Sequence, residues 1–155
     1  MTVMLLCLLM GIVAGLRTMT APAAVAVGAR CGAIAVAGTP LAFMGYTWTP
    51  WIFCILAVGE LITDQLPTTP SRKVPVQFAA RLLSGALAGA TLAAPQGSVV
   101  AGLVAGILGA VIGTLGGAAF RARLAAAFGK DRPAALIEDV VAIGAAALIV
   151  FIGHS

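Results

Sequence analysis

Apolar residues fill six segments of the chain, and polar or turn-forming residues separate them. The segments cover residues 2–16, 22–38, 51–66, 76–94, 98–120 and 133–153. A membrane-crossing helix needs about 20 mostly apolar residues. The pattern therefore predicts an all-α membrane protein, a compact bundle of five or six transmembrane helices that forms one domain over residues 1–155.

The number of crossings depends on the first 38 residues. Six crossings place both termini on the external side. One crossing followed by a broken or re-entrant helix gives five crossings and an internal N-terminus. No Lys or Arg precedes the first apolar run. Because a signal peptide begins with a basic region, we expect this run to be a retained transmembrane helix.

Composition and charge support a bilayer as the solvent. The chain is 61% hydrophobic and 9% charged, whereas soluble domains carry about 25% charged residues. The net charge of +4 comes mainly from Arg72, Lys73 and the stretch 121–132. The positive-inside rule places these stretches on the cytoplasmic side and Trp48 and Trp51 at the opposite interface. No basic stripe with interleaved aromatics is present, so we expect no nucleic-acid partner.

The two halves of the chain, 1–75 and 76–155, have similar patterns. Residues 11–28 align with residues 85–102 through shared glycines, alanines and a proline. Three helices per half would make the halves cross in opposite directions, which is the inverted-topology repeat of many transporters. Chance similarity between Gly/Ala-rich helices is the alternative.

Glycines spaced four residues apart form small-residue stripes. Such stripes let helices approach closely in lipid. The stripes serve either packing within the chain or the interface of a homodimer. We expect a homodimer, because so small a bundle often needs a partner to enclose a path for a solute. The spaced glycines are Gly11/Gly15, Gly85/Gly89, Gly102/Gly106 and Gly109/Gly113/Gly117.

Charged residues inside the apolar segments predict the candidate site. Glu60 and Asp64 are four residues apart and share a helix face, while the adjacent Glu138 and Asp139 diverge by about 100°. Burial of a charge at helix centre costs about 2.5–3.5 kcal/mol on insertion scales, so these groups should pair or line water. The predicted cluster comprises Arg17, Glu60, Asp64, Arg81, Glu138 and Asp139, with hydroxyls from Thr18, Thr20, Thr63 and Ser84.

Two functions are compatible with such a cluster. In the first, the chain is a small transporter or channel, and the cluster binds an ion or small polar solute. The carboxylates could hold a proton, Na⁺ or a divalent cation, and the arginines a carboxylate or phosphate. In the second, the chain is a non-transporting scaffold or lipid-headgroup binder, and the cluster is a structural salt-bridge network.

Catalysis has little support in the sequence. There is no HExxH, GxSxG or P-loop motif, and we expect neither an enzyme nor a cofactor. Cys7, Cys31 and Cys54 are scattered, which favours a role as small apolar packing residues.

Four strings carry a family resemblance. AGLRTMTAPAAVA (14–26), GELITDQLPTTPSR (59–72), AARLLSGALAGA (79–90) and ALIEDVVAIG (135–144) resemble the bacterial membrane family called domain of unknown function 4126. The resemblance spans almost the whole chain. It implies a multi-pass protein of the bacterial inner membrane and adds no activity.

Overall fold

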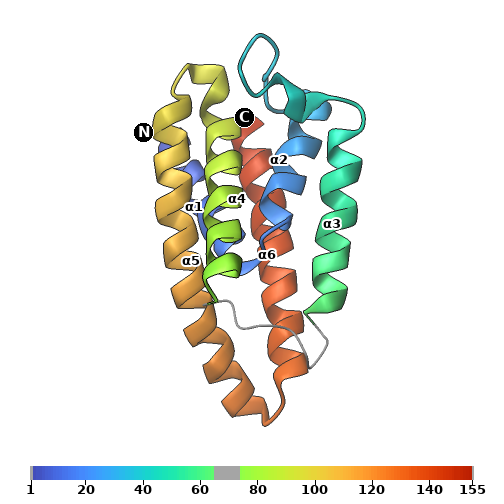
Figure 1. The fold of residues 1–155 in the computed structure, drawn as a ribbon, viewed down its shortest axis with the longest axis vertical. Helices are drawn as coiled ribbons and strands as arrows, with labels where there is room; N and C mark the ends of the chain where they lie inside the picture. The colour runs from blue at the N-terminus through green and yellow to red at the C-terminus, as the bar shows by residue number, and fades with distance from the viewer. Residues whose placement is uncertain (1, 65–73, 155) are drawn as a thin grey trace.

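The computed structural model describes residues 2–64 and 74–154, and these residues form an all-helical structure. Successive helices run in alternating directions, so both termini lie at the same end of the molecule (Figure 1). The helices are α1 (Thr2–Leu16), α2 (Thr20–Arg30), α3 (Thr49–Thr63), α4 (Pro75–Ala93), α5 (Val99–Phe128) and α6 (Asp131–His154), with short 3₁₀ turns η1 (Ala42–Gly45) and η2 (Ala94–Gln96).

Within the described residues, three helical stretches are long and apolar enough to cross a membrane, namely Pro75–Gln96, Val99–Phe128 and Asp131–Gly153. This finding suggests a multi-pass membrane protein, in agreement with the prediction from composition. Helices α1 and α3 have 15 residues each. At 1.5 Å per residue they span about 22 Å, less than the hydrocarbon core of about 30 Å.

Helices α1, α4 and α5 pack closely against one another through glycine faces. A Cβ atom built on Gly85 would lie 2.6 Å from the Gly106 carbonyl oxygen, and one on Gly15 would lie 2.5 Å from the Ala110 carbonyl oxygen. Larger residues would force these backbones apart. These stripes therefore serve packing within the chain, the first of the two predicted uses.

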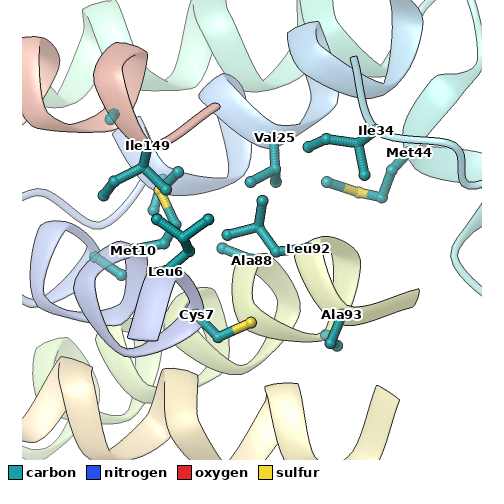
Figure 2. Packing of buried hydrophobic residues seen from close by; sticks show 14 of the residues in the cluster. Leu6, Cys7, Met10, Val25, Ile34, Met44, Ala88, Leu92, Ala93 and Ile149 are labelled. Carbon is teal, nitrogen blue, oxygen red and sulfur yellow. The ribbon is translucent and has the colours of Figure 1, made fainter. Parts of the chain in front are cut away.

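A second group of buried apolar residues joins this trio to α2 and α6. Met10 of α1, Val25 of α2, Leu92 of α4 and Ile149 of α6 point toward one another (Figure 2). Cys7 is fully buried, and its thiol donates a hydrogen bond to a backbone carbonyl of α4. Its predicted role as a packing residue agrees with this environment.

The second apolar segment is shorter as a helix than predicted. Residues 22–38 were expected to be helical, but α2 ends at Arg30. Gly32 and Gly38 have positive φ angles of 81° and 76°, a conformation that ends a helix. The residues between α2 and α3 form irregular backbone and η1 at the end of the molecule that carries the termini (Figure 1).

The prediction of a basic linker at residues 121–132 was wrong. Helix α5 continues past residue 120, so Arg121 and Arg123 are helical. The alanines that follow are the strongest helix formers, and the helix ends only at Gly129, where φ is 65°. Helix α6 then begins at Asp131. The other predicted basic loop, with Arg72 and Lys73, lies outside the described residues.

One geometric requirement of the predicted repeat is met simply because successive helices alternate in direction (Figure 1). Helices α1 and α4 run in opposite directions (Figure 1), as an inverted repeat requires. Both place their glycine faces on α5, however, so the matched glycines share one partner helix instead of each facing its own half. The repeat stays a prediction.

Candidate functional site

A break between α1 and α2 lies at the centre of the candidate site. Residues Arg17, Thr18 and Met19 join the two helices, and Arg17 is fully buried. Such a break leaves carbonyl oxygens at the end of α1 and N–H groups at the start of α2 without partners in their own helix. In an apolar environment these groups must be satisfied by other parts of the chain.

Glu60 satisfies the start of α2. Its two carboxylate oxygens accept hydrogen bonds from the backbone N–H groups of Thr18 and Met19, each at 2.7 Å. The positive end of the helix dipole also favours an anion at this position. Glu60 is thus an N-terminal cap of α2 that comes from another helix, α3.

Arg81 satisfies the end of α1. Its Nη1 donates hydrogen bonds to the carbonyl oxygens of Gly15 at 2.7 Å and Leu16 at 2.9 Å. Its Nη2 lies 3.9 Å from Oε1 of Glu60. A cation at a helix C-terminus is stabilised by the helix dipole, so the two oppositely charged caps of the break also attract each other.

Ser84 and Arg17 complete the contacts of the break. The Ser84 hydroxyl donates a hydrogen bond to the Thr18 carbonyl oxygen. Arg17 forms ion pairs with Asp64, the C-cap residue of α3, and with Asp139 of α6. Its Nε atom is buried and has no hydrogen-bond partner among the described residues. Polar side chains from α3, α4 and α6 therefore join these three helices to the break between α1 and α2.

The cluster is asymmetric in exposure. The Arg17 side chain is 0% exposed, while the side chains of Glu60, Asp64 and Asp139 are 14%, 13% and 11% exposed. The carboxylates thus form its outer edge and the guanidinium group its interior. An ion that approaches from outside meets negative charge first.

Glu138 lies in a neighbouring group. Its Oε2 is 3.7 Å from Nη1 of Arg121, and its side chain is 1% exposed. Arg121 also donates to both carboxylate oxygens of Asp131, so it ties the α5–α6 hairpin together. Asp139 pairs with Arg17, whereas the contact described for Glu138 is with Arg121. The expectation that only one of the two faces Glu60 stays a prediction.

Two of the predicted hydroxyls have other surroundings. The Thr63 hydroxyl donates to the Glu60 carbonyl oxygen within α3, at 3.1 Å. Thr20 is buried and lines an apolar groove between α2, α3 and α6. Among the predicted hydroxyl residues, Ser84 supplies a side-chain bond to the break, and Thr18 supplies backbone groups.

The sequence reasoning missed Arg121 and Asp131 as members of the charged network. Arg121 was assigned to a loop, although it continues the four-residue spacing of Gly113 and Gly117 along the buried face of α5. That spacing was the signal that could have found it. The backbone N–H groups that hold Glu60 carry no sequence signal, since every residue except proline has one.

The cluster contains charged groups of both signs. Three carboxylates, from Glu60, Asp64 and Asp139, contact two guanidinium groups in the innermost part. Within residues 2–64 and 74–154, no three His, Cys, Asp or Glu side chains lie close enough together to hold a metal ion. The prediction of a divalent site therefore gains no geometric support.

Fold and site together describe an all-helical protein whose long apolar helices suggest a multi-pass membrane protein, with a cluster of buried charges at the α1–α2 break. No family model, no curated protein and no solved structure matches the chain. The resemblance to domain of unknown function 4126 and the bacterial inner-membrane location stay predictions.

Proposed function

We propose that the chain is a small membrane transporter or channel for a cation, with protons as the first candidate. The observation that carries this proposal is the α1–α2 break with its capping charges. Transporters commonly place their sites at broken helices, where helix ends bind anions and backbone carbonyls bind cations. Here Glu60 occupies the anion position and Arg81 the cation position.

The excess of carboxylates supports a cationic substrate. Counted over the described residues and with all five groups ionised, the innermost cluster of three carboxylates and two arginines carries one net negative charge. Burial makes such a charge costly. A bound proton or cation would neutralise it, and the partly exposed carboxylates are the groups that such an ion would reach.

Helix α3 is the proposed moving element. It packs mainly on α2 and η1, and among its residues only Pro50 is buried. Its inner end is held by Glu60 and Asp64, which bond to the break. Neutralising either carboxylate weakens this attachment, and we propose that the resulting motion of α3 is coupled to passage of the ion.

The proposed topology has an even number of crossings. Both termini lie at one end of the molecule (Figure 1), which supports an even number, and we propose six. The inverted repeat remains part of the proposal. The homodimer remains a prediction. The glycine stripes that suggested its interface face helices of the same chain.

Flux in proteoliposomes tests the function. We expect purified protein to carry protons or Na⁺ down an imposed gradient, read by an internal pH-sensitive dye. Glu60→Gln and Asp64→Asn should each lower the flux at least tenfold. Asp131→Asn is the matched control, because its carboxylate is 61% exposed and lies on the α5–α6 hairpin; it should retain flux within about twofold.

Circular dichroism and elution as a single species establish that each variant is folded. Flux equal to that of empty liposomes would refute the proposal that the protein transports protons or Na⁺. Undiminished flux in both folded variants would remove the α3 carboxylates from the mechanism.

A non-transporting scaffold is the second candidate, and one observation favours it. Glu60 accepts two backbone hydrogen bonds and lies near Arg81, as a purely structural cap would. In that case Glu60→Gln would lower the free energy of unfolding, and neither the unaltered protein nor its folded variants would carry ions in proteoliposomes.

A further inference from the structure

An open apolar groove separates α3 from α6. Its volume is about 460 Å³, within the range of small-molecule sites. It begins one residue from the charged cluster, at Thr20 and Leu61, and follows α3 toward the end that carries the termini. The groove is lined by Thr20, Ala23, Ala24, Val27, Cys54, Ala57, Val58, Leu61, Ile143, Ala146, Ala147 and Val150.

A second hollow of about 320 Å³ continues the groove. The two share Val27 and Cys54. This end has a different chemistry, because Arg30, Thr47 and Trp51 line it. Arg30 is the last residue of α2 and is exposed. Trp51 is 64% exposed.

We propose that the groove and its continuation form one binding site for an anionic phospholipid. An acyl chain would lie along α3 between the alanines, and the phosphate would contact Arg30 and Thr47. Trp51 sits where indoles prefer to lie, at the level of the headgroups. The site is separate from the charged cluster and does not depend on the proposed transport.

Charge complementarity selects the headgroup. All five acidic residues of the chain belong to the Arg17 cluster or to the α5–α6 hairpin group. They therefore lie toward the opposite end of α3, and none of these five acidic side chains lies beside Arg30. A guanidinium group binds phosphate well, and one basic residue near a membrane surface strengthens binding of anionic lipid about fivefold.

The wall chemistry selects an acyl chain for the inner part. Between Thr20 and the Arg30 end, the lining consists of alanine, valine, leucine, isoleucine and cysteine side chains. A peptide segment would bring backbone N–H and C=O groups that these walls cannot pair. A hydrocarbon chain has no such requirement, and the surrounding bilayer supplies it.

Quenching of Trp51 by brominated lipid tests the proposal. The chain has two tryptophans, so Trp48→Phe leaves Trp51 as the only one. In vesicles of phosphatidylcholine mixed with phosphatidylglycerol, bromine is placed on the acyl chains of one lipid at a time. We expect the brominated phosphatidylglycerol to reach half-maximal quenching at a mole fraction about fivefold lower than brominated phosphatidylcholine does.

Substitutions identify the site. In the Trp48→Phe background, Arg30→Gln should abolish the fivefold preference and Arg30→Lys should retain most of it. Arg132→Gln, an exposed arginine at the opposite end, should leave the preference unchanged. Ala57→Phe, which fills the groove, should reduce quenching by both lipids.

Equal quenching by the two lipids would overturn the proposal, because ordinary boundary lipid gives that result. A preference that survives Arg30→Gln would overturn it as well. Quenching that falls as the protein-to-lipid ratio rises would show instead that a second copy of the chain covers the groove. The Arg30 variants remain informative even if Ala57→Phe does not fold.

Discussion

The close approach of α4 and α5 makes a quantitative prediction for Gly85→Ala. The new Cβ would lie 2.6 Å from the Gly106 carbonyl oxygen and 2.8 Å from the Ala110 Cβ. Against an ordinary contact of 3.4 Å, the larger shortfall is about 0.8 Å. The Gly106 oxygen belongs to the backbone, so the helices themselves must separate.

A separation of that size weakens the whole seam. A gap of 0.5–1 Å removes roughly a quarter to a half of the dispersion attraction of each atom pair, and inserting a methylene into a well-packed core costs about 1–3 kcal/mol. We therefore expect Gly85→Ala to lower the free energy of unfolding by about 2 kcal/mol. Reversible unfolding in mixed detergent micelles, followed by circular dichroism, measures this change.

Gly116→Ala is the control within α5. A Cβ at Gly116 meets nothing within 4 Å, and alanine favours a helix over glycine by about 1 kcal/mol. This variant should be unchanged or slightly stabilised. If Gly85→Ala and Gly116→Ala shift the unfolding free energy equally, the glycine contact is not what holds α4 against α5.

Two further predictions concern the break. Arg17→Met leaves two carboxylates without their cation and should lower the free energy of unfolding by about 3–5 kcal/mol. The control Arg123→Met, at an exposed arginine, should change it by less than about 0.5 kcal/mol. Equal effects of the two variants in the same micelle assay would contradict the ion pairs. Ser84→Ala removes the hydroxyl that bonds to the break and should cost about 1 kcal/mol, with no loss of flux; a flux loss without destabilisation would instead place Ser84 in the ion path.

The sequence supported the membrane class and the identity of the central charges. So few charged residues cannot cover a water-facing surface, and buried charges of opposite sign must meet in an apolar interior. These two constraints alone bring Arg17 to the α3 and α6 carboxylates. They are global and do not depend on exact helix ends.

Other features depended on local details that the pattern does not contain. The end of α2 depends on glycines with positive φ, and a Gly/Ala-rich run gives no period from which to read that end. Arg121 follows an apolar run, and a charge at that position is typical of a loop, but α5 continues through Arg121 to Phe128. Glu60 was predicted to pair with charges, but its shortest contacts are to backbone N–H groups.

The origin of the two caps has a consequence for biosynthesis. The α1–α2 hairpin is made first, yet the groups that cap its break are added later: Glu60 lies 42 residues after Thr18, and Arg81 lies 66 residues after Gly15. Until then its open backbone groups would each cost several kcal/mol in lipid. The N-terminal hairpin should therefore stay in the insertion machinery or in contact with water until α4 has been synthesised, and a nascent chain halted before Arg81 should remain extractable from the membrane.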